Sequence, residues 1–573
     1  MNRTSHRHLL LVAPAFLLLL AFFVTPLAAA LWNSFHGAAF DLSSYREAFS
    51  NPLYFHVFLR TLEVGAGVTA ICLVLGYPIA YFMTTLSPRA LAVCGFFVLV
   101  PLFTAFLIRT FGWMIILGRG GALNRLLLYL GVISTPLKIT GTSTAVYVGM
   151  VHVLMPVAVF VLFAGMRQVD RTLLSAAQVL GANPVQAFLR VYVPMTIPAV
   201  ISAGLLVFIM ALGFYVTPVL LGGPADTMIS QLIVTQVTTL LNLEFGYALS
   251  VILLAATVGV LTISNLFVPL EQMWSLQSHE GGKTRGWRSS QIVAGARRAA
   301  LWIIEKAAQL LLGRPRWLAR TLLRAYVVLA AIFLILPLII IYILSFSSSP
   351  FLIFPPPGFS WQWYEKFFSD PDWQSALFMS LKLAAATATV SVVVGASSAF
   401  GLVRGTFAGK QVLLLFLIAP LLVPVVVVAL SLYVSLSHLH LLGTFLGLVI
   451  GHMVITVPYA VVISVAAVRG LDVNLEHAAS TLGAAQPVVQ RRVVLPQLAP
   501  ALGTAWILCF LTSLDELLIT LFLLGRQTET LPIRMWSDIR IQVDPVMSVA
   551  ASVIVTAVAV LIMTSQYRTL KAK

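Results

Sequence analysis

Twelve long apolar runs, separated by short polar segments, constrain this chain more than any other feature of its sequence. Each run has roughly 20 or more mostly apolar residues, the length that an α-helix needs to cross a bilayer. Barrel strands are far shorter, about ten alternating residues each. We therefore expect an all-α polytopic membrane protein with about 12 transmembrane helices. The runs cover residues 8–32, 60–85, 90–117, 144–166, 196–221, 247–270, 324–346, 377–403, 411–437, 441–468, 498–525 and 548–567.

The distribution of charge agrees with this class. Only 9% of the 573 residues are charged, against about a quarter in soluble proteins. The net charge of +16 comes from Lys and Arg clustered between apolar runs, not from one basic face, which argues against nucleic-acid binding. Such clusters are typical of cytoplasmic loops, so we expect both termini in the cytoplasm. The first run resembles a signal peptide but is long enough to span, so we expect an uncleaved helix.

The runs divide into two halves of similar design. Residues 1–270 and 323–573 each hold six runs, and residues 271–322 form a basic cytoplasmic linker between them. Within the linker, "IVAGARRAALWIIEKAAQLLLG" is typical of a basic amphipathic helix that lies on the membrane lipid at the inner surface. Six spans per half give both halves the same orientation. We therefore expect a pseudo-two-fold axis along the membrane normal, with a pathway between the halves.

A small, partly basic segment occurs once in each half, between the fourth and fifth runs. "SAAQVLGANPVQAFLRVYVP" begins at Ser175 and "HAASTLGAAQPVVQRRVVLP" at His477, with eight of 20 positions identical. We expect a short helix in each, a turn at Gly181 or Gly483, and a second run that ends just before the next span. One copy alone would favour a simple connector. Two copies at the same cytoplasmic position favour a docking surface for another protein.

These segments resemble the EAA loop of bacterial ABC importer permeases, a motif of the form E-A-A-x-x-x-G followed at a distance by I-x-L-P. The acidic position is replaced here, and Glu476 stands one residue early in the second copy. The resemblance implies coupling helices that dock two copies of an ABC ATPase subunit. The aligned residues are Ser175, Ala176, Ala177, Gly181 and Pro194 in the first segment, and His477, Ala478, Ala479, Gly483 and Pro496 in the second.

The flanking sequences extend the resemblance to spermidine/putrescine-type importers of the polyamine/opine/iron group. "GYPIAYF" and "LLVFIMALGFYVTPVLLGG" in the first half, with "FLTSLDELLITLFLLG" and "TLPIRMWSDIR" in the second, are similar to their two permeases. The resemblance implies both permeases fused in one inner-membrane chain. It also implies a small cationic solute, most simply a polyamine, delivered by a periplasmic binding protein. Ferric iron, an opine or an aminophosphonate remain alternatives.

Four residues are candidates for the substrate pathway. Asp515 and Glu516 lie in the eleventh run, where ionisable groups are costly and therefore functional candidates. Phe214 and Tyr215 lie at the corresponding place in the first half, and aromatic faces also hold ammonium groups. The alternative is that the acids pair with a structural basic residue, for which Arg109 is the candidate, or lie in water at a helix end.

No catalytic chemistry is expected in this chain. "QSHEGGKT" (277–284) lacks the first glycine of a phosphate-binding loop and lies in a polar linker. His152, His452 and His477 are isolated, so we expect no metal site and helix-packing or surface roles. ATP and magnesium would therefore belong to partner ATPase subunits, with no cofactor in this chain. The competing class, a 12-helix secondary transporter, would need no ATPase.

Overall fold

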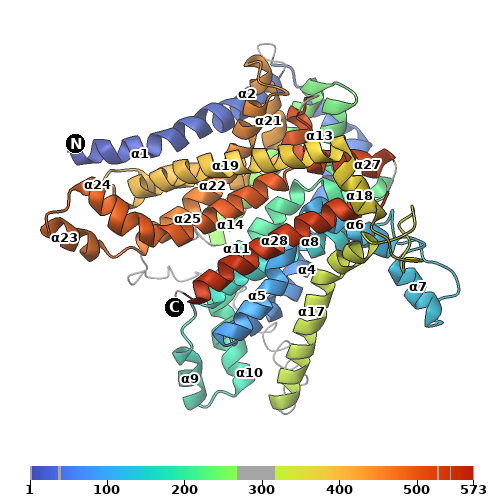
Figure 1. The fold of residues 1–573 in the computed structure, drawn as a ribbon, viewed down its shortest axis with the longest axis horizontal. Helices are drawn as coiled ribbons and strands as arrows, with labels where there is room; N and C mark the ends of the chain where they lie inside the picture. Colours follow the sequence, from blue (N-terminus) through green and yellow to red (C-terminus); the bar gives the residue numbers. More distant parts are fainter. Residues whose placement is uncertain (1–2, 36–39, 268–315, 526–527, 542–543, 572–573) are drawn as a thin grey trace.

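The computed structural model describes residues 3–35, 40–267, 316–525, 528–541 and 544–571. These residues are mostly helical, and the only β-pairing among them is one isolated bridge between Ser347 and Phe359. The expected all-α fold is confirmed (Figure 1). The amphipathic helix predicted in the linker lies outside the described residues.

In the first half, long helices alternate with short ones at their ends. The elements are α1 (Arg3–Leu19), η1 (Leu20–Val24), α2 (Thr25–Asn33), α3 (Ser43–Ser50), α4 (Pro52–Met83), α5 (Pro88–Leu102), α6 (Phe106–Leu117), α7 (Ala122–Tyr129), α8 (Ser143–Met166), α9 (Thr172–Val179), α10 (Pro184–Ala187), η3 (Phe188–Tyr192), α11 (Val193–Leu212), α12 (Val216–Leu221), η4 (Pro224–Asp226), α13 (Ile229–Thr238) and α14 (Leu243–Phe267).

The second half repeats most of this order. Its elements are α17 (Arg316–Leu344), α18 (Gln362–Ser369), α19 (Pro371–Arg404), α20 (Lys410–Ile418), η5 (Ala419–Leu422), α21 (Val425–His438), α22 (Phe445–Arg469), α23 (Val473–Thr481), α24 (Gln486–Val489), η6 (Gln490–Val494), α25 (Leu495–Leu514), α26 (Leu518–Leu523), α27 (Leu531–Ile541) and α28 (Val546–Lys571). Among the described residues, no helix corresponds to α7 between α21 and α22.

The predicted count of twelve spans is met only when bent and short helices are included. Ten described helical stretches are long and apolar enough to cross a membrane. A further pair, Lys410–Leu422 and Val425–His438, is bent by 99° and counts as one more span if taken together. The apolar helices Pro88–Leu102 and Val546–Leu561 are shorter than a full span. The predicted third run is therefore divided between α5 and α6.

The breaks fall at equivalent places in the two halves. Helices α6 and α21 begin at Phe106 and Val425, 319 residues apart, each after a non-helical turn. In the second half the turn is explained by Pro424, because the residue before a proline is driven to an extended conformation and Val423 has φ −109° and ψ 132°. Helices α11 and α25 end at Leu212 and Leu514, 302 residues apart. The sequence repeat is thus a structural repeat.

The first helix of each half packs against the other half. Helix α1 packs along α19 and α20, and α2 packs against α21. In return α17 packs against α4, α5 and α6. The Tyr326 hydroxyl on α17 donates to the Leu75 carbonyl at 2.6 Å, and the Ser397 hydroxyl donates to the Leu11 carbonyl at 3.1 Å. Figure 1 shows α1 beside α19 and α17 beside α5. The halves are therefore interlocked and not merely juxtaposed.

The short helices gather at two ends of the molecule. Figure 1 shows α23–α24 at the left and α9–α10 at the bottom, at the ends of two arms that diverge. Helices α13 and α27 lie at the opposite ends of these arms. The two repeated segments are therefore both placed at protruding positions.

Candidate functional site

The two repeated segments fold into the same helix and turn. Helix α9 and helix α23 each end at a glycine in the left-handed region, with φ +92° at Gly181 and +84° at Gly483. The Gly181 and Ala182 amides each donate at 3.0 Å to carbonyls three and five residues earlier. The Gly483 and Ala484 amides do the same at 3.0 and 3.1 Å. This is the Schellman pattern, in which glycine avoids the Cβ penalty. The predicted helix and glycine turn are confirmed.

The beginnings of these helices also match. The Asp170 carboxylate accepts the Thr172 amide, and the Asp472 carboxylate accepts the Asn474 amide, both at 2.9 Å. The backbone hydrogen bond from Thr172 lowers the pKa of Asp170 below its ordinary value. The side chain therefore remains an ionised cap at neutral pH, which favours the helix N-terminus.

Both helices are almost entirely uncovered. Neither contains a buried residue. Leu180 and Leu482, at equivalent positions, are each 88% exposed. The motif residues share one pattern, with Ser175, Ala176, His477 and Ala478 exposed and Ala177 and Ala479 half-buried. A leucine exposed twice in the same place marks a surface suited to a protein partner.

The second run of each segment differs from the prediction. It does not end before the next span, because α10, η3 and α11 form one helical stretch from Pro184 to Leu212. Pro194 is the second residue of α11, which follows the π-helical turn Phe188–Tyr192, and Pro496 is the second residue of α25, which follows the π-helical turn Gln490–Val494. Proline lacks an amide hydrogen and crowds the carbonyl four residues earlier. The wider π turn accommodates it without ending the helix.

A long helix ties each repeated segment to the opposite end of its half. Helices α4 and α19 have 32 and 34 residues, about 50 Å at ~1.5 Å per residue. At one end the Arg171 guanidinium donates to the Thr84 carbonyl at 2.5 Å, and the Arg404 guanidinium pairs with Glu476 at 2.6 Å. Glu476, which stands one residue before the acidic position of the motif, thus forms an ion pair within this chain.

The opposite ends of α4 and α19 hold the short helices α13 and α27. The Thr61 hydroxyl accepts the Ile229 amide at 2.9 Å, and the Ser380 hydroxyl accepts the Leu531 amide at 2.7 Å. Thr61 and Ser380 are 319 residues apart, and Ile229 and Leu531 are 302 apart, so the two bonds are equivalent. Each long helix therefore connects a protruding segment at one end to a short helix at the other.

The two acids of the predicted pathway lie at a helix break and not within a continuous helix. Asp515 and Glu516 follow the last residue of α25 and precede α26. The Asp515 carboxylate accepts the amide of Phe106 at 2.9 Å, across the two halves. The Glu516 carboxylate accepts the amide of Ile519 at 2.8 Å. Both acids therefore cap helix N-termini, where negative charge is favoured.

The predicted aromatic residues lie beside the acids at the corresponding break. Phe214 and Tyr215 are 7% and 6% exposed. The Phe214 ring lies 5.7 Å from the ring of Phe106, whose amide binds Asp515. The Tyr215 ring lies 5.4 Å from Trp536. The structure thus brings Asp515 and Phe214 together around Phe106, while Tyr215 faces the second half at α27.

Arg109 is not a direct partner of these acids. It is completely buried, its Nη1 donates to the Val153 carbonyl at 3.1 Å, and its guanidinium carbon lies 5.1 Å from the Phe106 ring centroid. Among the described residues no ion pair within 4.0 Å joins it to Asp515. The proposed pairing is therefore indirect, through the shared neighbour Phe106.

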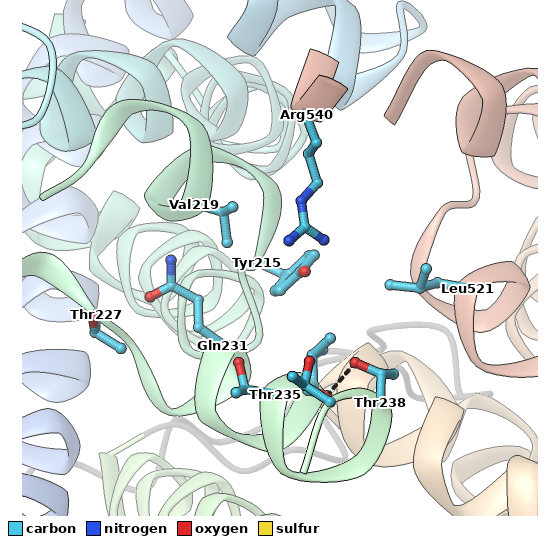
Figure 2. Close-up of a pocket in the computed structure, with 10 residues that line it drawn as sticks. Tyr215, Val219, Thr227, Gln231, Thr235, Thr238, Leu521 and Arg540 are labelled. Carbon is cyan, nitrogen blue, oxygen red and sulfur yellow. Dashed lines mark hydrogen bonds between the residues drawn. The ribbon is translucent and has the colours of Figure 1, made fainter. Parts of the chain in front are cut away.

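A pocket of about 280 Å³ lies between α12 and α13 of one half and α26 and α27 of the other (Figure 2). Two pairs of its residues are equivalent in the repeat, Val219 with Leu521 and Thr238 with Arg540, each 302 apart. The pocket is therefore lined by residues of both halves, and two pairs of them correspond in the repeat. Sequence reasoning missed it, although this register would have aligned Thr238 with Arg540.

The buried histidines serve packing, as expected. The His152 Nε2 lies 3.0 Å from the Leu334 carbonyl. The His452 ring nitrogens lie 2.8 Å from the Ser513 hydroxyl and 3.0 Å from the Thr520 hydroxyl. In the part of the chain that the structure describes, no group of three or more His, Cys, Asp or Glu is arranged to hold a metal.

Known proteins resemble this chain in both halves. The family model described as binding-protein-dependent transport system inner membrane component matches residues 63–270 and again 391–573. The spermidine/putrescine transport system permease protein PotB of Escherichia coli (strain K12) is 39% identical over 220 residues, 38% of this chain and 80% of that protein. PotC of Haemophilus influenzae (strain ATCC 51907 / DSM 11121 / KW20 / Rd) is 30% identical over 247 residues, 43% of this chain and 96% of that protein.

Among solved structures, a bacterial ABC transporter involved in the import of alginate covers 44% of this chain and 92% of its own, with 16% identity and a TM-score of 0.35. The two family matches together span more than half of the chain and include both repeated segments. The chain therefore belongs to the family of binding-protein-dependent transport system inner membrane components and carries the family domain twice in one polypeptide.

Proposed function

We propose that this chain supplies both membrane halves of an ATP-driven importer and binds two copies of an ABC ATPase subunit. The observation that carries the proposal is the pair of protruding helices α9 and α23, which share caps, glycine turns and an 88% exposed leucine. Two equivalent surfaces suit two copies of one partner. ATP and magnesium would be held by that partner, and this chain would have no catalytic role.

The topology of such an importer follows from these surfaces. The repeated segments, both termini and the basic linker would lie in the cytoplasm of a bacterium, and the short helices α13 and α27 at the periplasmic face of the inner membrane. A periplasmic binding protein would deliver its solute there. Helices α4 and α19 would connect that face to the ATPase, because each is hydrogen bonded at both ends.

A polyamine is the substrate that we propose. The relatives PotB and PotC are named as permeases of a spermidine/putrescine transport system. The acids Asp515 and Glu516, with Phe214 beside them, provide carboxylate and aromatic groups between the halves. Carboxylates and aromatic faces are the groups that stabilise an ammonium in a membrane.

Uptake of labelled spermidine into proteoliposomes tests this function. The vesicles would contain this chain with its ATPase, and the binding protein would be added outside. We expect uptake that requires ATP and that unlabelled putrescine reduces by competition. Stimulated ATP hydrolysis without spermidine uptake would reject the polyamine, and uptake driven by an ion gradient without ATP would reject the importer.

The Arg404–Glu476 pair provides a test of coupling through α19. Arg404→Glu is expected to lower ATP-driven uptake by roughly three- to tenfold, because it replaces a partly buried ion pair with two like charges. Arg404→Glu combined with Glu476→Arg should recover most of that loss, since the pair is restored with its polarity reversed. Uptake and ATPase co-purification would be measured together. A double variant no better than the single one would mean that the pair does not position α23.

A further inference from the structure

The pocket between the two halves carries a charge that the proposed transport of a cation does not explain. Its lining is otherwise neutral, with Tyr215, Gln231, Thr235 and Thr238 as polar groups. Arg540 is the only charged residue among the lining residues, and its guanidinium points toward Tyr215 (Figure 2). A permanent positive charge in this pocket repels a polyamine that enters between the halves.

Arg540 is also unpaired, unlike the neighbouring arginine on the same helix. Arg534, six residues earlier on α27, lies within 4.0 Å of Asp372, Glu529 and Asp538. Within the described ranges Arg540 makes no ion pair or hydrogen bond, and its guanidinium carbon lies 6.0 Å from the Trp536 ring centroid. The Arg540 side chain is exposed. The helix therefore presents one arginine held by acids and one with its donors directed into a pocket.

We propose that this pocket is a docking site for an acidic side chain of the periplasmic binding protein, which rests on the proposed function. A carboxylate matches the planar guanidinium through two hydrogen bonds. The Gln231 amide and the Thr235 and Thr238 hydroxyls add polar partners around it. The pocket attracts a carboxylate of the binding protein and repels a cationic solute, because Arg540 carries a positive charge.

This site links docking to passage of the cation. The pocket is lined by Tyr215, which lies in the break that holds Phe214, and by Leu521, which follows the break that holds Glu516. A docked carboxylate neutralises Arg540 at the entrance to the acids. The pocket then no longer repels a polyamine, and this change lasts only while the binding protein is docked.

The test is the affinity of the binding protein for this chain, reconstituted with its ATPase in nanodiscs, at low and at physiological salt. Arg540→Glu is expected to weaken binding about tenfold, and Arg540→Gln about threefold, with a smaller salt dependence in both. Arg540→Lys keeps the charge but lacks the planar guanidinium, so its affinity for the binding protein should lie between that of Arg540→Gln and that of the wild type. Lysine substitutions at exposed acids of the binding protein would then identify the partner residue, as the one that restores binding to Arg540→Glu.

Arg125→Glu is the matched control. It changes the net charge equally on α7, which does not line the pocket, and binding should stay within about twofold of wild type. Wild-type affinity and salt dependence in Arg540→Glu would overturn the inference. So would unchanged binding-protein affinity together with faster spermidine uptake, which would mean that Arg540 acts on the solute. Failure of the wild-type chain to bind the binding protein would instead overturn the proposed function, and this inference with it.

Discussion

Replacing Gly181 and Gly483 together by valine is expected to lower ATP-driven uptake strongly and to weaken binding of the ATPase. Both glycines have a left-handed backbone, with φ +92° and +84°. A residue with a Cβ costs roughly 1–2 kcal/mol in this region, and a β-branched residue is a strong outlier there. The double variant therefore carries roughly 2–4 kcal/mol of strain, relieved by opening the two turns. Since 1.4 kcal/mol is tenfold in an equilibrium constant, uptake should fall by more than about tenfold.

Asparagine at the same two positions is the control, because it tolerates the left-handed region better than other residues. Space does not limit either substitution, since a Cβ at Gly181 or Gly483 would meet no atom within 4 Å. Gly181→Asn with Gly483→Asn should thus keep most uptake and ATPase co-purification. Equal activity of the valine and asparagine variants would mean that the turns do not shape the docking surface. Equal loss in both would point instead to steric exclusion of a partner that approaches the glycines closely.

These turns were predictable because everything that determines them is local. A glycine after a short alanine-containing helix specifies the same turn in both halves, and the repeat at 302 residues marked it as more than a connector. The proline that follows was misread for the opposite reason. Proline is compatible with a helix start, but whether the preceding helix ends or widens into a π turn depends on the packing of that stretch. At Pro194 and Pro496 the helix continues.

The pathway was only partly predictable from sequence. Apolar composition identified a span at residues 498–525, but it could not reveal that the helix stops at Leu514. The Asp515 carboxylate receives the Phe106 amide, 409 residues away. Such a contact depends on how the halves pack, as does the exchange of α1 and α17 between them. Arg540 was passed over because one arginine in a polar segment has no pattern of its own.

Replacing both acids by their amides, Asp515→Asn with Glu516→Gln, is expected to lower spermidine uptake by more than about tenfold. The amides keep an oxygen that accepts the Phe106 and Ile519 amides, so both helix caps are retained. The charge alone is lost. An ammonium 4 Å from a carboxylate gains about 4 kcal/mol at an effective dielectric of ~20. Losing that stabilisation slows passage of a cation without unfolding the break.

Alanine at the same positions separates charge from capping. Asp515→Ala and Glu516→Ala remove both the charge and the acceptor, so they should be as defective in uptake as the amides and also less stable to heat. Glu63→Gln removes an acid whose side chain is 63% exposed on α4, and its uptake should stay near wild type. If the amide variant transported spermidine normally while the alanine variant did not, the carboxylates would serve only as helix caps. A cation would then be stabilised by the aromatic residues at the break of the first half, Phe214 and Tyr215.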